Sequence, residues 1–324
     1  MVKVVRIHKA GDPSVMKIED VPIDRPGSDE VVIRQTAIGL NYIDVYVRSG
    51  LYPLDSFPSV IGMEGAGIVE ELGESVDDFV EGDRVAYPMS LGAYAEKRTI
   101  PASKLVKLPD TIDEQIAASI MLKGLTAHYL IFRTYKVQTG DPILVYAAAG
   151  GVGLIICQWA KILGASVIGC VGSPEKATMA KAHGCEKIIL YKEEDIAKKV
   201  MEFTDGKGVA VVYDSVGKDT FEASLNSLRP FGTLVTYGNA SGPVAPFSPS
   251  ILGPKGSLYV TRPTLATHIA SRDLLLEGTN MLFDVIGTKA IKINYNQTYA
   301  LTDVKKAHQD LENRLTTGST ILFP

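Results

Sequence analysis

The glycine-rich stretch Y-A-A-A-G-G-V-G, residues 146–153, carries the clearest chemical signal in the chain. An apolar run precedes it and a long apolar helix pattern follows it, so the local order is strand, glycine turn and helix. Within it, Ala148-x-Gly150-x-x-Gly153 matches the dinucleotide-binding pattern G-x-G-x-x-G, with alanine in the first position. Ala148 permits a tight turn, Gly150 lets the backbone approach a pyrophosphate, and Gly153 lets the helix pack closely. The N-terminus of that helix would bind the phosphates. An ordinary strand-to-helix turn is the alternative for such a motif taken alone.

The residues after the second strand of this unit indicate which dinucleotide is bound. Ser173 lies twenty residues beyond Gly153, where an NAD-preferring site places an acid that binds the ribose 2′-hydroxyl. This chain has no acid there: Gly172 and Ser173 leave room for a 2′-phosphate, and Lys176 adds positive charge one turn into the next helix. A solvated surface lysine is the alternative for Lys176 taken alone. We therefore predict NADPH as the cofactor.

The composition is typical of a soluble globular protein with two domains. The chain has 324 residues, of which 46% are hydrophobic and 22% charged, and this length exceeds what one core usually serves. Its net charge of −4 gives no general attraction for a polyanion. The three cysteines, Cys157, Cys170 and Cys185, are an odd number without metal-ligand spacing, which favours free thiols in a reducing cytoplasm. There is no signal-peptide pattern and no apolar run of membrane-spanning length, so we predict a cytoplasmic protein without a membrane partner.

The chain has two regions with different patterns of predicted secondary structure. Up to about Pro109, short strand patterns are broken by frequent glycine and proline, which is typical of an antiparallel barrel or sandwich. From about Thr126 to Thr261, strand and helix patterns alternate, which predicts a doubly wound parallel sheet. The expected strands of this second region are Ile143–Ala147, Ser166–Val171, Lys187–Leu190, Val209–Tyr213 and Gly232–Tyr237. The expected helices are Gly151–Leu163, Pro174–His183, Glu193–Phe203 and Asp219–Leu228.

The last part of the chain returns to a mixed texture. We expect helices at 271–286 and 302–313, each followed by a strand. We interpret this tail as part of the first domain, so that the nucleotide domain is inserted in the middle of the chain, with a cleft between the two. The predicted fold class is therefore α/β, with residues 1–125 and 264–324 forming one domain and residues 126–263 the other.

Further motifs are spread over nearly the whole length of the chain. They are G-L-N-Y-I-D at 39–44, R-S-G-L-Y-P at 48–53, G-M-E-G-A-G-I-V at 62–69, L-K-G-L-T-A at 122–127, Y-D-S-V-G at 213–217 and Y-G-N-A-S-G at 237–242. In these motifs the chain resembles the zinc-independent quinone oxidoreductases, the zeta-crystallin group of the medium-chain dehydrogenase/reductase superfamily. The resemblance implies a Rossmann domain inserted in a GroES-like β-barrel catalytic domain. It also implies that NADPH reduces a quinone.

A contrast with the zinc alcohol dehydrogenases of that superfamily bears on the chemistry. Those enzymes carry a Gly-His-Glu motif whose histidine binds zinc, whereas this chain has Gly62-Met63-Glu64. Their first cysteine ligand falls near Asn41, and no cysteine precedes Cys157 here. We therefore expect no metal, and a structural or polar-network role for Glu64. Without a Lewis acid the acceptor must be easily reduced, as quinones and α,β-unsaturated carbonyls are.

By the same resemblance, four residues lie where the barrel domain meets the nicotinamide. Tyr46 and Tyr52 would form walls of the acceptor site or donate hydroxyl hydrogen bonds to the acceptor. Asn41 would be a polar contact near the nicotinamide, and Asp44 would anchor it from behind. Taken alone, Asn41 and Asp44 are equally explained as turn caps, and the tyrosines as half-buried packing.

The resemblance also implies a set of residues that contact NADPH. Those near the nicotinamide, its ribose and the phosphates are Lys123, Thr126, Tyr129, Ala148, Gly150, Gly151, Val152 and Gly153. Those around the 2′-phosphate and adenosine are Gly172, Ser173, Lys176 and Tyr191. Those at the carboxyl ends of later strands, where open α/β sheets bind ligands, are Ser215, Gly238 and Asn239. Arg314, on the final helix, would reach the cofactor from the catalytic domain. Exposed surface positions are the alternative for Arg314 and Lys123.

Two further expectations concern assembly and the competing functions. The apolar stretch Gly256–Thr261, centred on Leu258–Val260, is expected to form a sheet edge that pairs with a second copy, which gives a homodimer. An NADPH-dependent alkenal or enone reductase on the same fold is the close alternative to a quinone reductase. A cofactor-binding protein with little turnover, like the crystallin or RNA-binding relatives, is the alternative of another class. The acidic net charge makes nucleic acid an unlikely partner.

Overall fold

The computed structural model describes all residues, Met1–Pro324, and the chain divides into two compact units. The central unit is Thr126–His268. The split unit combines Met1–Leu125 with Ile269–Pro324. The chain therefore leaves the split unit once and returns to it, and each unit has a sheet of its own.

The central unit is built on a six-stranded sheet in which every neighbouring pair of strands is parallel. Its order is β11-β10-β9-β12-β13-β14. The strands are β9 (Pro142–Tyr146), β10 (Ser166–Val171), β11 (Lys187–Leu190), β12 (Val209–Asp214), β13 (Leu228–Thr236) and β14 (Tyr259–Thr261). The chain runs outward from β9 in one direction through β10 and β11 and in the other through β12 and β13. The boundary between β9 and β12 is therefore the topological switch point, outside which such sheets bind ligands.

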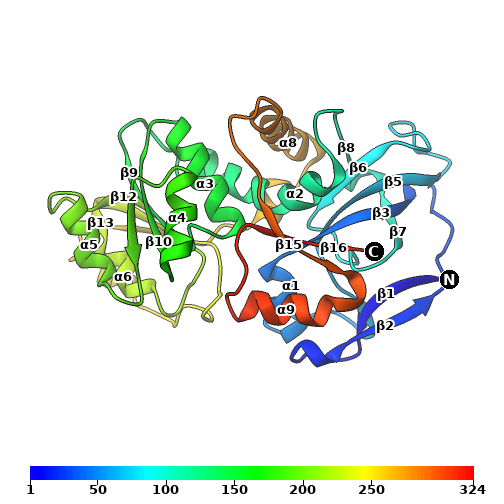
Figure 1. Cartoon of the computed structure of the whole chain (residues 1–324), viewed down its shortest axis with the longest axis horizontal. Coiled ribbons are helices and arrows are strands. Elements are labelled where there is room, and N and C mark those ends of the chain that lie inside the picture. The colour runs from blue at the N-terminus through cyan, green and yellow to red at the C-terminus, as the bar shows by residue number, and fades with distance from the viewer. The chain divides into compact units, whose positions relative to one another are not determined.

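Helices connect these strands and run alongside them (Figure 1). They are α3 (Gly151–Ile162), α4 (Pro174–Ala182), α5 (Ile196–Phe203) and α6 (Phe221–Asn226), with α7 (Leu265–His268) at the end of the unit. The start of α4 was predicted correctly, because Ser173 accepts a hydrogen bond from the Lys176 N–H at 3.4 Å and proline occupies the first helical position. The predicted start of α5 at Glu193 was wrong. Asp195 caps that helix by accepting from the Lys198 N–H at 2.9 Å, so the helix begins at Ile196.

The split unit contains two further sheets. A seven-stranded sheet has the order β15-β16-β3-β5-β6-β8, with β7 paired to β3, and a smaller sheet has the order β2-β1-β4. The strands are β1 (Val2–Ile7), β2 (Met16–Val21), β3 (Glu30–Leu40), β4 (Ser59–Val60), β5 (Glu64–Leu72), β6 (Arg84–Pro88), β7 (Lys97–Pro101), β8 (Val106–Lys107), β15 (Tyr295–Ala300) and β16 (Ser319–Phe323). All pairs among β1 to β8 are antiparallel, as the frequent turns in this part of the sequence predict. The returning segment adds β16 beside β3, so both ends of the chain build one sheet.

Four helices belong to the split unit wholly or in part. They are α1 (Tyr42–Ser49), α2 (Glu114–Tyr129), α8 (Arg272–Gly287) and α9 (Val304–Glu312). The sequence patterns did not predict α1, which follows β3 directly and ends at Gly50. Gly50 has φ of 86°, a left-handed conformation that glycine adopts at helix ends without steric cost. Helix α2 runs across the boundary between the units and continues into a π-helical turn, Leu130–Thr134.

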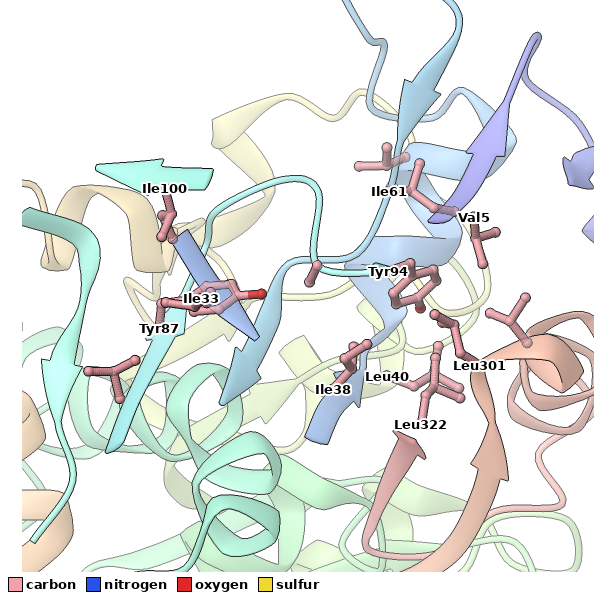
Figure 2. Packing of buried hydrophobic residues seen from close by; sticks show 14 of the residues in the cluster. Val5, Ile33, Ile38, Leu40, Ile61, Tyr87, Tyr94, Ile100, Leu301 and Leu322 are labelled. Atoms are coloured by element: carbon pink, nitrogen blue, oxygen red, sulfur yellow. The ribbon is translucent and has the colours of Figure 1, made fainter. Parts of the chain in front are cut away.

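The core of the split unit is formed by the inward faces of its sheets. Figure 2 shows Tyr94 among Val5, Ile61 and Leu301, which belong to the same buried cluster. The Tyr94 ring is fully buried, so its hydroxyl must find partners inside the protein. The predicted fold class, a doubly wound domain inserted in a β-rich one, is confirmed by these sheets and by the path of the chain.

Candidate functional site

The glycine turn after β9 has the geometry that the dinucleotide motif predicts. Gly150 is the N-cap of α3, and its N–H donates to the carbonyl of Ala147 at 2.8 Å. A Cβ atom on Gly153 would lie 2.3 Å from the Ala147 oxygen, so only glycine lets α3 pack this closely on the turn. A Cβ on Gly150 would lie 3.1 Å from the same oxygen, which is tight but leaves room for a small adjustment.

The first turn of α3 provides the phosphate-binding groups. The N–H groups of Gly151, Val152 and Gly153 lie in this turn, where a helix has no carbonyl of its own to offer them. Ala148 is fully buried beneath the turn, and its N–H donates to the Cys170 carbonyl at 3.2 Å. The turn is thus fixed from below and leaves its N–H groups for a ligand.

A second group of predicted residues lies together at the ends of β10 and β11. A Cβ on Gly172 would lie 2.7 Å from the Tyr191 hydroxyl oxygen, so Gly172 allows that hydroxyl to approach the chain. Ser173 and Lys176 stand in the cap and the first turn of α4. Glu175 also belongs to this turn, and a hydrogen bond from Ser173 lowers the pKa of its carboxyl group. A lysine and a carboxylate therefore flank the same turn.

Two loops cross at the ends of β12 and β13 and bring Ser215 beside Gly238. The Ser215 carbonyl accepts from the Ala240 N–H at 3.2 Å, and a Cβ on Gly238 would lie 2.3 Å from that same carbonyl oxygen. Asn239 lies between Gly238 and Ala240 in the same loop. Because β12 neighbours β9, this crossing adjoins the glycine turn at the switch point.

Asp214, the last residue of β12, holds the first of these loops. Its carboxyl accepts from the N–H groups of Val216 at 2.7 Å and Gly217 at 3.1 Å, and from the hydroxyls of Thr220 at 2.7 Å and Ser224 at 3.2 Å. Burial raises the pKa of Asp214, and the four donors oppose that effect. Asp214 was not predicted as a site residue from the sequence, although it lies in the Y-D-S-V-G motif.

Thr126 and Tyr129 lie one turn apart at the end of α2, and both are buried. The Tyr129 ring stacks on His268, with ring centroids 4.4 Å apart and planes 3° from parallel. Burial lowers the pKa of His268, and the charge of Arg133 lowers it further. Tyr129 also acts electrostatically on Tyr237, which follows β13, so the end of α2 lies near the same end of the sheet.

In the split unit, the predicted residues Asn41 and Asp44 meet at the start of α1. Asn41 is the N-cap, and its backbone N–H donates to Asp44 Oδ2 at 2.8 Å. The amide nitrogen of Asn41 donates to Glu64 Oε2 at 2.8 Å and more weakly to the Gly39 carbonyl at 3.3 Å. Asn41 and Asp44 form the capping box of α1, while the Asn41 amide nitrogen bonds to Glu64.

Glu64 is the centre of a buried polar cluster. Its Oε1 accepts from the Leu122 N–H at 2.7 Å, and its Oε2 accepts from Lys123 Nζ at 3.2 Å as well as from Asn41. The Lys123 side chain is 8% exposed and that of Glu64 is 0% exposed, so the ion pair is shielded from water. The predicted network role of Glu64 matches these contacts.

A second chain of buried hydrogen bonds ends on Asp44. Arg48 Nη1 lies 3.0 Å from His308 Nδ1, Nε2 of the same ring lies 2.9 Å from the Tyr94 hydroxyl, and that hydroxyl lies 3.0 Å from Asp44 Oδ2. Arginine can only donate, so Nδ1 accepts, and the neutral His308 ring carries its proton on Nε2. That N–H donates to Tyr94, which donates to Asp44. This order of donors fixes the position of the proton in each hydrogen bond from Arg48 to Asp44.

Burial sets the charge states along this chain. It lowers the pKa of His308 to about 3, with help from the charge of Arg48, so the ring is neutral. It raises the pKa of Asp44 to about 7, although the Asn41 N–H and the Tyr94 hydroxyl oppose the shift. The second oxygen of Asp44, Oδ1, is buried and has no hydrogen-bond partner, so it is the oxygen that would carry a proton. Arg48 makes a two-pronged pair with Glu312, with both N–O distances 2.8 Å.

The predicted tyrosines form an aromatic cluster beside this network. The rings of Tyr46 and Tyr52 meet edge to face with centroids 5.2 Å apart, and Tyr42 lies 6.0 Å from Tyr46. Tyr46 is buried and Tyr52 half-buried. Such a cluster offers flat apolar surface with hydroxyl groups at its edge.

The prediction that Arg314 lies on the final helix was wrong. Helix α9 ends at Glu312, Asn313 is its C-cap, and Arg314 follows with φ of 60° in the left-handed region. Its N–H donates to the Leu311 carbonyl at 3.0 Å, which closes the helix end. Arg314 therefore belongs to the turn between α9 and β16 (Ser319–Phe323).

Three network members, Arg48, Tyr94 and His308, were not selected from the sequence. Arg48 belongs to the R-S-G-L-Y-P motif, which indicated only the family resemblance, and His308 is a single histidine with no other histidine near it in the sequence. They lie far apart in the chain, and only the pairing of the returning segment with β3 brings them together. No local spacing signals such a cluster.

Two further observations bear on the kind of site. No group of three or more His, Cys, Asp or Glu side chains converges as a metal ion requires. None of the helices is both long and apolar enough to cross a membrane.

Family models match both parts of the chain. The "alcohol dehydrogenase GroES-like domain" model matches residues 27–110, and the "zinc-binding dehydrogenase" model matches residues 151–269. The first match lies in the split unit and the second covers most of the central unit.

Similar proteins match the chain from end to end. A quinone oxidoreductase of Pseudomonas aeruginosa is 51% identical over 100% of both chains. A 2-haloacrylate reductase of a Burkholderia species is 44% identical over 100% of this chain and 99% of the relative. The solved structure of Escherichia coli quinone oxidoreductase complexed with NADPH superimposes with a TM-score of 0.97 at 46% identity, covering 99% of this chain and 100% of that one.

Proposed function

The chain belongs to the quinone oxidoreductase family of the medium-chain dehydrogenase/reductase superfamily, and we propose that it reduces a quinone with NADPH. The observation that carries the proposal is a set of turns at the switch point of the central unit. The glycine turn, the Ser173 turn and the Ser215–Gly238 crossing all lie at the carboxyl end of the parallel sheet. These turns have the geometry of a dinucleotide site.

The residues of the central unit fit NADPH. The first turn of α3 would hold the pyrophosphate through Gly151, Val152 and Gly153. Gly172, Ser173, Lys176 and Tyr191 would surround the 2′-phosphate and adenosine, and no acid stands at position 173 to select a free 2′-hydroxyl. The residues that would contact the nicotinamide half are Thr126, Tyr129, Ser215, Gly238 and Asn239. Bound NADPH supplies the hydride, and the protein binds and orients it.

The split unit supplies the acceptor residues in this proposal. Tyr46 and Tyr52 offer a flat aromatic wall to a planar acceptor, and Asn41 and Lys123 offer hydrogen-bond donors and charge. Asp44 fixes the Asn41 backbone, and Arg314 would approach the cofactor from its turn. We propose that the reaction uses no metal. Metal analysis of the purified protein should find well below one equivalent of zinc, and about one equivalent would refute this part.

An enone or unsaturated-acid reductase is the second candidate. It is favoured by the 44% identity with a 2-haloacrylate reductase over the whole chain. The deciding experiment measures NADPH oxidation with a series of quinones, enones, 2-chloroacrylate and aldehydes. A quinone reductase should show its highest kcat/KM with quinones, and a higher value with an enone or 2-chloroacrylate would favour the second candidate.

We also propose a cytoplasmic homodimer that pairs through the edge strand β14 (Tyr259–Thr261). This strand has one neighbour, β13, within the chain, and Tyr259 is 60% exposed on it. An exposed strand edge of this kind favours pairing with a second copy.

A further inference from the structure

Glu64 joins three segments of the split unit through a single buried carboxylate. It contacts the Leu122 N–H, the Asn41 amide and the Lys123 ammonium at 2.7, 2.8 and 3.2 Å. Two of these three donors are side chains that the proposed function places near the reacting groups. Glu64 thereby fixes the relative position of an amide and a cation.

The ammonium group of Lys123 has more N–H donors than acceptors that it contacts in the protein. Lysine carries three N–H donors, and Glu64 is the only acceptor that its Nζ contacts in this structure. Its side chain is only 8% exposed, so water cannot readily satisfy the other two. Buried donors without partners are rare in proteins and are costly, which points to a ligand that accepts from Lys123.

A cation at this position suits the proposed reaction. Glu64 pairs with Lys123 inside the protein and supplies its counter-ion. A fixed ammonium in a site shielded from water stabilises negative charge far better than it would in solution. Because its counter-ion is already in place, it needs no rearrangement when that charge develops.

We propose that Lys123 is a catalytic residue that hydrogen-bonds the acceptor oxygen, and that Glu64 is the positioning residue that holds its ammonium there. This rests on the proposed function. The hydride of NADPH adds to one carbonyl oxygen of the quinone, the π electrons shift through the ring onto the opposite carbonyl oxygen, and Lys123 donates a hydrogen bond to that oxyanion. Water then supplies the proton that completes the hydroquinone, and NADP⁺ is the oxidised product.

The test compares Lys123→Met, Glu64→Gln and the double variant in the full-length protein. Lys123→Met should lower kcat with a quinone by about 100-fold, the loss typical for one oxyanion donor, and leave the NADPH dissociation constant unchanged. Glu64→Gln should lower kcat by at least about tenfold. The double variant should be no slower than Lys123→Met, because Glu64 acts through Lys123. Lys123→Arg should restore part of kcat, since arginine keeps the charge.

Binding and stability readouts separate this role from a structural one. NADPH binding is measured by nucleotide fluorescence without acceptor, and unfolding by thermal denaturation. The matched controls are Glu70→Gln and Lys97→Met, which break the 2.5 Å pair between Glu70 on β5 and Lys97 on β7, whose side chains are 28% and 36% exposed. Both controls should leave kcat unchanged. If Glu64→Gln does not fold because a buried charge is left unpaired, the double variant removes both charges and still compares with Lys123→Met.

Two results would overturn the inference. Weaker NADPH binding by Lys123→Met with unchanged kcat would make Lys123 a cofactor contact. Losses of kcat that add up in the double variant and parallel its loss of thermal stability would make both residues structural. Failure of the proposed function gives a different result: the unchanged protein would then fail to oxidise NADPH with any of the quinones or enones tested.

Discussion

Lys176 is the residue on which the choice of NADPH over NADH rests. It stands in the first turn of α4, and the cap of that helix is Ser173, where an NAD site places an acid. Lys176→Glu should therefore lower kcat/KM for NADPH at least about tenfold, because a charge-assisted hydrogen bond to phosphate is lost. The value for NADH should not fall. Steady-state kinetics with both nucleotides measures this preference.

The same turn provides its own controls. Lys181→Glu changes an exposed lysine in the last turn of α4 and should leave the NADPH/NADH ratio unchanged. Glu175→Gln removes the carboxylate that shares the Ser173 hydroxyl and should raise the preference for NADPH. If Lys176→Glu leaves the ratio where it was, Lys176 is a solvated surface lysine.

At the scale of one element, the two glycines of the turn have different roles: Gly153 allows close packing of α3, and Gly150 allows the cofactor to approach. A Cβ on Gly153 meets the Ala147 carbonyl oxygen at 2.3 Å and Ala148 Cα at 2.8 Å, both backbone atoms that cannot move aside. Gly153→Ala should destabilise the protein by about 1–3 kcal/mol, as overpacking does. Gly150→Ala meets the nearest atom only at 3.1 Å and should cost less stability but weaken NADPH binding, because the pyrophosphate passes close to it. Chemical denaturation and NADPH titration of both variants check this. Equal stability of the two variants would contradict it.

Helices α1 and α9 are joined by two buried groups whose titrations oppose each other. The folded-state pKa of Asp44 is raised to about 7, so its contribution to stability is present at low pH and is lost as pH rises from about 4 to about 7. The folded-state pKa of His308 is lowered to about 3, so its contribution is present above about pH 6.5 and is lost as pH falls toward 3. The shifts correspond to about 4 kcal/mol for Asp44 and about 5 kcal/mol for His308, and the two nearly cancel between about pH 4 and 6.5.

Removing Asp44 should expose this balance. With Asp44→Asn, the free energy of unfolding relative to the unchanged protein should rise by about 4 kcal/mol as pH increases from about 4 to about 7, because only the unchanged protein loses stability by ionising Asp44. The groups around Asp44, namely Tyr94, Lys123 and Glu64, are the same in both proteins. Urea denaturation at a series of pH values gives the difference directly. A difference independent of pH would show that Asp44 does not titrate in this range.

The elements were predicted well where a short-range pattern determines them. Strands β10 and β11 have the predicted bounds, since alternating strand and helix patterns with clear caps define them. Helix α1 was missed, because its start depends on Asp44 reaching back to Asn41 and its end on Gly50, with no long apolar repeat between. The buried chain from Arg48 to Asp44 depends on contacts between residues more than 200 positions apart, such as Tyr94 with His308, and local patterns carry no information about those.

At the scale of the whole molecule, each unit has its own sheet, and the two contribute different parts of the proposed chemistry. The central unit carries the nucleotide-binding turns at the switch point, and the split unit carries the Glu64 and Asp44 networks. Both halves of the split unit are needed for the second network, since His308 comes from the returning segment. A chain shortened before α9 should therefore lose the Asp44 network even if the central unit still folds and binds NADPH. Limited proteolysis and NADPH fluorescence on such a shortened chain measure the two properties separately.

The assembly is the last property argued at this scale. Strand β14 is the outermost strand of the six-stranded sheet, and Tyr259 is 60% exposed on it, so a second copy pairing there would remove apolar surface and satisfy the open edge. Light scattering at micromolar concentration should give twice the 34.9 kDa mass of one chain. Tyr259→Asp should shift the protein to the monomer, because a charge placed at a pairing edge is costly to bury. Val80→Asp, at a residue 61% exposed in the split unit, is the matched control and should leave the mass unchanged. A single-chain mass for the unchanged protein would refute the dimer, and a dimer that survives Tyr259→Asp would place its interface away from β14.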